Sequence, residues 1–195
     1  MKKIFTALVI TLIAISFTTL NAQNQAFKKG NLNLSLGYGI IPTFINEGGN
    51  VNMPPISARL GYAVTNNFNL AGYVGYSATT SKPEIISDGI LSETRNDLVI
   101  LGLRGEFHTN RDEKFDFYGG FMFGYNIPMV EETSSNDGSK IIRNPDEPFK
   151  YPEAENNFIY SGFVGASYFF KPKMAAYAEV GYGISLVNLG LTFKL

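Results

Sequence analysis

The sequence contains no cysteine and no tryptophan, and it has a single histidine. Without cysteine, the chain has no disulfide, no thiolate metal ligand, no cysteine nucleophile and no cysteine for lipid attachment. Charged residues make up 17% of the chain, below the roughly 25% typical of soluble domains. Aromatic residues reach 14%, and all of them are Phe or Tyr. A chain poor in charge and rich in aromatic residues indicates that part of its surface does not face water.

An excess of positive charge is also missing, since the formal net charge is −1. Nucleic-acid-binding proteins usually carry a basic stripe or patch. The charge balance therefore argues against a nucleic-acid partner.

Residues 1–22 have the order of a secretory signal peptide. Lys2 and Lys3 come first, an apolar run extends from Ile4 to Phe17, and small or polar residues follow up to Ala22. A membrane anchor is the alternative, but the run is shorter than the roughly 20 residues that span a bilayer. We predict that residues 1–22 are removed on export and that residues 23–195 form one domain.

Long helical periods are absent from residues 23–195, where apolar and polar residues alternate instead. A period of two is typical of β-strands. Eight segments show it, and the sequence predicts an all-β fold. The segments are 31–40, 56–65, 68–78, 98–108, 115–126, 158–170, 174–185 and 187–195. In the seventh segment we assign Val180, Tyr182 and Ile184 to the apolar face.

The connections between these strands are alternately long and short, except for the last. The long ones are residues 41–54, 79–94 and 128–156. In an up-and-down barrel with an even number of strands, alternate connections lie at the same rim. We therefore expect the long loops at one rim, and the short turns at the other rim together with both chain ends.

Alternation alone does not say whether the apolar face points into the barrel or away from it. A soluble lipocalin-like barrel has it inside, and a membrane barrel has it outside. The polar face here is mostly Gly, Ser and Asn, with a few charges of both signs, as a narrow interior requires. These charges are Arg59, Arg104, Glu106, Asp116 and Glu179. The apolar face carries Phe and Tyr towards the strand ends, as interfacial aromatic girdles do.

The last strand ends in "GLTFKL", with Gly190, Phe193 and Leu195. This pattern resembles the C-terminal insertion signal of bacterial outer-membrane barrels, although an aromatic last residue is commoner there. Together with the N-terminal segment, it makes the chain resemble the small eight-stranded outer-membrane β-barrel family of Gram-negative bacteria. The resemblance implies an eight-stranded antiparallel up-and-down transmembrane barrel, located in the outer membrane, with lipid and the barrel-insertion machinery as partners.

An eight-stranded barrel is just wide enough for its own side chains to fill it. We predict that the five charged residues of the polar face form a salt-bridged plug, with Arg104 and Glu106 as its nucleus. The sequence contains no metal-ligating cluster and no cofactor motif. His108, the one histidine, is interpreted as a rim residue without a catalytic role, because no His-x-Ser pattern accompanies it.

The favoured function is a non-enzymatic barrel whose long loops carry any recognition, including that of an envelope protein partner. Three alternatives stay open: a narrow pore for water or small ions, a soluble periplasmic ligand-binding barrel, and an enzyme acting on lipid A through His108. The loop 128–156 is rich in acidic residues, but its spacing is not that of an EF-hand.

Overall fold

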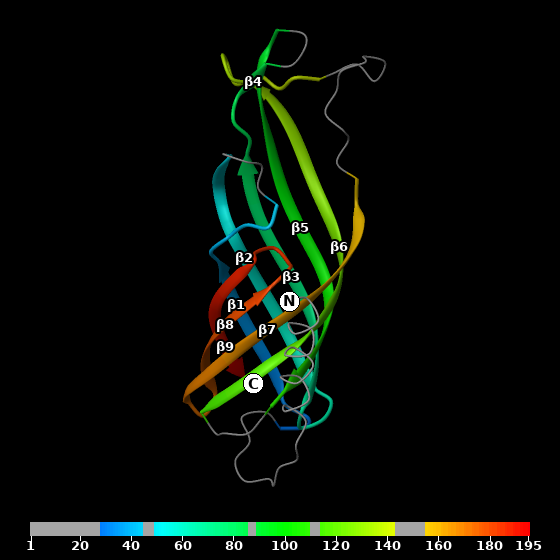
Figure 1. Ribbon diagram of the computed structural model, residues 1–195, viewed down its shortest axis with the longest axis vertical. Coiled ribbons are helices and arrows are strands. Elements are labelled where there is room, and N and C mark those ends of the chain that lie inside the picture. Colours follow the sequence, from blue (N-terminus) through cyan, green and yellow to red (C-terminus); the bar gives the residue numbers. More distant parts are fainter. Residues whose placement is uncertain (1–27, 45–48, 86–88, 110–113, 143–154) are drawn as a thin grey trace, which may run out of the picture.

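The computed structural model describes residues 28–44, 49–85, 89–109, 114–142 and 155–195, and these form a closed antiparallel barrel (Figure 1). The predicted signal peptide and the start of the predicted domain lie outside the described residues. Within the described ranges, no helix is long and apolar enough to cross a membrane. The strands are β1 (Leu32–Gly39), β2 (Asn50–Ala63), β3 (Phe68–Thr80), β4 (Glu84–Ile85), β5 (Leu91–His108), β6 (Phe115–Ser134), β7 (Asn157–Lys171), β8 (Met174–Gly181) and β9 (Val187–Lys194).

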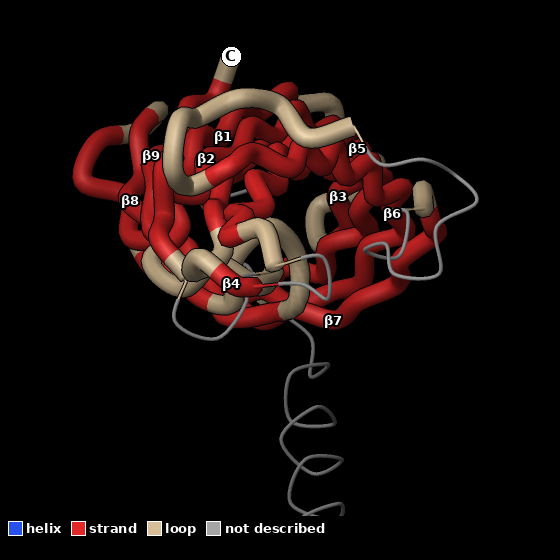
Figure 2. Tube along the Cα trace, turned by 90° about the horizontal axis from the view of Figure 1, so that it is seen from above, coloured by secondary structure: helices blue, strands red, loops and turns tan. Residues whose placement is uncertain are grey.

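Eight of these strands make the wall, which is visible end-on in Figure 2. Their order is β3-β2-β1-β9-β8-β7-β6-β5, and pairing between β3 and β5 closes the circle. The two-residue strand β4 pairs only with the outer end of β5. β9 pairs with β1 from Asn33↔Lys194 to Gly39↔Asn188. The last strand therefore pairs the backbone N–H and C=O groups at the free edge of the first strand. Such groups must be paired within the protein when they lie in hydrocarbon.

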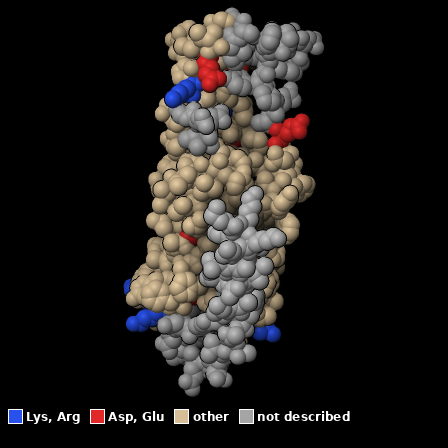
Figure 3. Space-filling model, viewed as in Figure 1, with Lys and Arg blue, Asp and Glu red and all other residues tan. Residues whose placement is uncertain are grey.

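The apolar face of the wall points outward. Leu101 and Phe121 are each 47% exposed and Val180 is 57% exposed, whereas Arg59 and Glu179 retain 7% and 5% exposure. Figure 3 shows the same division, with few charged atoms on the middle of the barrel and coloured side chains gathered towards its two ends. The predicted eight-stranded transmembrane barrel is confirmed, and a soluble barrel with an apolar interior and a polar outer surface is excluded.

The wall is uneven in height. β1, β8 and β9 have 8 residues each, whereas β5 has 18 and β6 has 20. β5 and β6 stay paired up to Ser92↔Ser134, beyond the last pairing of β3 with β5 at Thr80↔Arg95. In Figure 1 this hairpin projects above the other strands and meets β4 at its tip.

The predicted loop boundaries are therefore wrong at several strand ends. Parts of the predicted loops 41–54, 79–94 and 128–156 belong to β2, β3, β4, β5 and β6. On β5 and β6 the outward side chains of these parts include Glu93 and Glu131, so the apolar alternation stops there while backbone pairing continues to Ser92↔Ser134. Hydrophobic alternation marks the length of strand that faces an apolar medium, not the full length that pairs. The short turns after β2, β5 and β7 lie at the opposite rim as predicted, whereas the short turn between β8 and β9 lies at the long-loop rim beside Ile41 and Pro42.

Candidate functional site

Four charged side chains meet inside the barrel and form a closed ring of ion pairs. Arg104 binds Glu179 through two nitrogens, with Nη1–Oε1 at 3.0 Å and Nη2–Oε2 at 2.6 Å, and its Nε lies 3.1 Å from Glu106 Oε1. Arg59 Nη1 donates to Glu106 Oε1 at 3.0 Å and to Glu179 Oε2 at 3.1 Å. Each arginine thus contacts both carboxylates, and all four side chains are buried. We call these residues the ionic ring.

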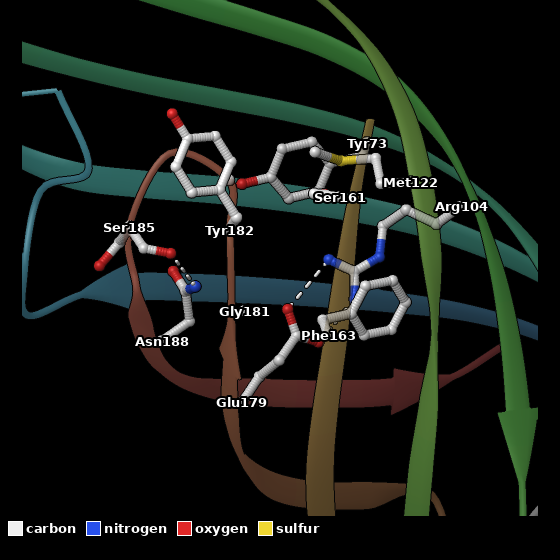
Figure 4. Close-up of a pocket in the computed structure, with 11 residues that line it drawn as sticks. Tyr73, Arg104, Met122, Ser161, Phe163, Glu179, Gly181, Tyr182, Ser185 and Asn188 are labelled. Carbon is white, nitrogen blue, oxygen red and sulfur yellow. Dashed lines mark hydrogen bonds and ion pairs between the residues drawn. The ribbon is translucent and has the colours of Figure 1, made fainter. Parts of the chain in front are cut away.

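The residues of the ionic ring come from β2, β5 and β8, which are distant in the sequence. Each lies at an inward position of its strand, and Arg104 and Glu106 are two residues apart on β5. The sequence predicted a nucleus at this neighbouring pair. The two-nitrogen contact is instead made across the barrel, between Arg104 and Glu179 (Figure 4).

Neutral groups complete the surroundings of the ring. Tyr118 Oη donates to Glu179 Oε2 at 3.1 Å, and Asn69 Nδ2 donates to Glu106 Oε2 at 2.7 Å. The guanidinium of Arg104 lies 3.6 Å from the centre of the Phe163 ring, and that of Arg59 lies 5.0 Å from the centre of Tyr177. Buried charges are tolerated when they are paired and hydrogen-bonded. The ring is therefore held in one arrangement.

Asp116 lies apart from the ionic ring and pairs with His108. His108 Nδ1 is 2.5 Å from Asp116 Oδ2, and its Nε2 is 3.7 Å from Glu106 Oε2. His108 is the last residue of β5, at the short-turn end of the barrel where the sequence predicted it. It has the same strand parity as Arg104 and Glu106, so its side chain shares their face and is buried in the interior.

An apolar layer begins at the level of the ionic ring and fills the interior from there towards the long-loop rim. It is a cluster of buried side chains with Phe44 and Ile159 packed against it, namely Tyr73, Leu98, Ile100, Tyr118, Met122, Phe163 and Ile184. Tyr118 and Phe163 also contact the ring below, so the two layers are continuous. Two sets of side chains thus block the interior: the ion pairs of the ionic ring and the apolar side chains packed next to them.

Ile184 reaches this layer from the turn between β8 and β9, and its predicted position on the lipid-facing side is wrong. The side chain is fully buried because β8 ends at Gly181, after which the strand alternation no longer applies. Ser185 Oγ lies 2.7 Å from the carbonyl oxygen of Ile41 and 2.8 Å from that of Val187, so its one proton can be donated to either, and it accepts from the N–H of Ile41 at 3.2 Å. These contacts fix the turn. A Cβ on Gly75 would lie 2.9 Å from Ile184 Cβ, so the glycine on β3 leaves the space that Ile184 fills.

A small cavity lies between the ionic ring and the inward turn (Figure 4). Its volume is about 10 Å³, which suffices for roughly one water molecule. Ser161 Oγ and Asn188 Oδ1 line it and have no hydrogen-bond partner among the described residues. Within the described ranges, no group of three or more His, Cys, Asp and Glu side chains is placed to hold a metal ion. This cavity has room for water and none for a larger ligand.

The three residues of the predicted insertion signal lie on β9 and just after it. Gly190 faces the interior, where a Cβ would come 2.5 Å from the Tyr177 ring. Phe193 pairs with Leu34 across the closing seam, and Leu195 is 64% exposed. The Tyr177 ring lies too close to the backbone at position 190 for any side chain, which explains why the residue there is glycine. The role of the three residues in insertion stays a prediction.

Comparison with known proteins gives a family and a set of structural neighbours. Residues 10–192 match the family described as "Outer membrane protein beta-barrel domain". No curated protein matches the chain. The outer membrane protein OprG of Pseudomonas aeruginosa is similar in structure, with a TM-score of 0.60, 10% identity, and coverage of 89% of this chain and 99% of OprG. The attachment invasion locus protein Ail of Yersinia pestis, solved with a heparin analogue, gives a TM-score of 0.48 at 13% identity, covering 85% of this chain and 95% of Ail.

Proposed function

The chain belongs to the outer membrane protein beta-barrel family, and from this premise we propose that it is a non-enzymatic, non-conducting barrel. Its body anchors it in the outer membrane of a Gram-negative bacterium, and its projecting β5–β6 hairpin presents a recognition surface. The observation that carries the proposal is the double closure of the interior, by the ionic ring and by the apolar layer above it.

Closure argues against the pore alternative. A conducted ion would have to separate Arg104 from Glu179, which leaves uncompensated buried charge at a cost of about 3–5 kcal/mol. It would then have to displace Ile184, Met122 and Ile100 from a packed layer. The cavity between the ionic ring and the turn that carries Ile184 holds roughly one water molecule.

The experiment is conductance of the refolded mature chain in planar bilayers, with insertion verified by the change in gel mobility on heating. We expect no unitary conductance steps at either polarity. Discrete steps that change when Arg59 or Arg104 is replaced by Ser would favour the narrow pore and end the proposal of a closed barrel.

The surroundings of His108 argue against an enzyme acting on lipid. The imidazole is buried inside the barrel against Asp116, so it faces the interior and not the surrounding bilayer. We expect His108→Ala to leave the acyl chain composition of lipid A in the host unchanged. A change in that composition with a normally folded variant would revive the enzyme alternative.

Recognition is assigned to the long-loop rim because β5 and β6 extend their pairing well past the rest of the wall. Since the native chain has no cysteine, single cysteines report sidedness cleanly. On intact cells, a membrane-impermeant maleimide should label Ser135→Cys, in the turn after β6. It should label Lys173→Cys, in the β7–β8 turn, only after the envelope is permeabilised. The reverse pattern would place the recognition surface on the wrong side.

We also propose that residues 1–22 direct export and that the insertion machinery recognises the last strand through Gly190, Phe193 and Leu195. Exchange of Phe193 for Asn should slow insertion in cells while the chain still refolds in detergent. Equal slowing in both would point to a folding defect rather than to lost recognition. An envelope protein bound through the loops is part of the same proposal, and pull-down with Ser135→Cys carrying a crosslinker tests it.

A further inference from the structure

The short-turn rim carries a set of lysines. They lie at the ends of strands or in turns, and their side chains are exposed; they are Lys28, Lys29, Lys114, Lys171 and Lys173. We call them the lysine rim. Lys194 is not one of them, because its Nζ lies 4.1 Å from the centre of the buried Phe169 ring. We propose that the lysine rim binds anionic phospholipids of the periplasmic leaflet through their phosphate groups. The proposal rests on the orientation given above, with the short turns towards the periplasm.

The charge at this rim is of one sign among the described residues. The acidic side chains nearby, Glu106 and Asp116, are buried in the interior and paired there. The undescribed part of the β5–β6 turn adds Arg111, Asp112 and Glu113 by sequence, which leaves the rim basic. Figure 3 shows Lys and Arg side chains at the lower end of the barrel.

The opposite rim has the opposite character, so the lysines do not reflect a generally basic chain. Acidic side chains outnumber basic ones among its described residues. They are Glu84, Glu93, Asp97, Glu131, Glu132, Asp137 and Glu155 against Lys82, Arg95 and Lys140. A field of this sign attracts anions to the short-turn rim only.

Exposed apolar side chains of the outer face are the sequence neighbours of two rim lysines at the strand ends, and this favours a lipid over a soluble acidic partner. Lys171 follows Phe170, which is 45% exposed, and Lys114 precedes Phe115, which is 48% exposed. Phe115 packs on Tyr168 with ring centres 4.9 Å apart. A lysine covers apolar surface with its stem while its ammonium reaches water. The rim thus has hydrocarbon contacts next to cationic groups, in the order in which a phospholipid presents acyl chain and phosphate.

The experiment measures lipid selectivity by electron spin resonance of the mature chain refolded in phosphatidylcholine vesicles. Spin-labelled phosphatidylglycerol is compared with spin-labelled phosphatidylcholine, and the result is the ratio of their association constants. We expect a ratio of about five at low salt, the factor that roughly 1 kcal/mol for one lysine at an anionic lipid gives. High salt should bring the ratio close to one, because exposed charges are screened.

The variants locate the effect. The triple variant Lys29→Gln, Lys171→Gln and Lys173→Gln should lose most of the selectivity, and the same positions changed to Arg should retain it. The matched control, Lys82→Gln with Lys140→Gln at the long-loop rim, should behave as the wild type. Heat-dependent gel mobility verifies that each variant is folded, and the salt series on the wild type tests the proposal without any variant.

A ratio near one for the wild type, or a ratio that neither salt nor the triple variant lowers, would overturn the proposal. In the first case an acidic periplasmic protein becomes the better candidate for this rim. Lipid selectivity in refolded vesicles does not depend on how the barrel is oriented in cells. Failure of the cysteine labelling test therefore removes the proposed orientation, whereas failure here removes the lipid contact.

Discussion

The two halves of the interior solve the same problem by different means. Towards the short-turn rim, the barrel is filled by charges whose partners are fixed by distances of 2.6–3.1 Å. Towards the long-loop rim, it is filled by apolar side chains, one of which is supplied by a turn rather than a strand. The polar half is specified by hydrogen-bond geometry, and the apolar half by shape. Removal of one side chain should therefore lower the free energy of unfolding more in the polar half than in the apolar half.

The largest effect is expected for Glu106→Ala. Loss of this carboxylate leaves Arg59 and Arg104 without one of their two partners, which should lower the free energy of unfolding by about 3–5 kcal/mol. Urea titration in vesicles, with the folded fraction followed by gel mobility, measures the change. Glu131→Ala removes an exposed pair with Lys140 at 2.9 Å and should change stability by at most about 1 kcal/mol. Similar losses for the two variants would show that the ionic ring is not tightly held.

Next comes the apolar half. Ile184→Ala removes a fully buried side chain and should lower the free energy of unfolding by about 2–4 kcal/mol, as large-to-small core changes do. The control is Ile142→Ala, because Ile142 is 87% exposed and its loss should be nearly neutral. If both variants unfold at the wild-type urea concentration, the turn does not support the interior.

A smaller effect tests the fit between the turn and the wall. Gly75→Ala places a methyl group against Ile184 and should cost about 1–3 kcal/mol through overpacking. Gly72→Ala on the same strand has open space and serves as the control. The double variant Gly75→Ala with Ile184→Ala should lose less free energy of unfolding than the sum of the two single losses. The effects of residues in contact are not additive. Strict additivity would mean that the two residues do not touch.

The smallest effect is expected for the pKa of Asp137, an exposed carboxylate. It serves as a reference for the carboxylates buried inside the barrel. In the turn after β6, the backbone N–H and the hydroxyl of Ser139 donate to Asp137 and hold the pKa of that carboxyl below its ordinary value. A lowered pKa gives stability that is present above the unfolded-state pKa and lost as pH falls through the folded-state pKa. Titration by NMR should show this pKa rising in Ser139→Ala. An unchanged pKa would assign the shift to the backbone N–H of Ser139 and the hydroxyl of Ser134.

The two halves also differ in how well the sequence predicted them. Inward positions on strands follow from parity, so Arg59, Arg104, Glu106 and Glu179 could be assigned to one face. The contacts among these four residues depend on the register of the strands around the closed barrel. A single sequence does not reveal that register. Parity also placed Ile184, but on the wrong side, because the alternation was continued past Gly181 into a turn.

Strand lengths were underestimated for a related reason. The signal used was hydrophobicity, and it ends where the outward side chains become polar, near Arg95 on β5 and Glu131 on β6. Backbone pairing needs no apolar side chain, so it continues further. His108 is the reverse case: parity and the nearby turn placed it correctly at the end of β5 on the inward face, but its pairing with Asp116 on β6 could not be read from the sequence.

The inward turn has a consequence for how the barrel seals during assembly. The turn that carries Ile184 joins β8 to β9, and β9 is the strand that meets β1 at the seam. The contact of Ser185 with Ile41 joins the two sides of that seam, so it requires the seam to be closed. An assembly intermediate with an open seam should therefore let water and ions through. Pairing of β9 with β1 then closes the wall and places Ile184 in the interior at the same time.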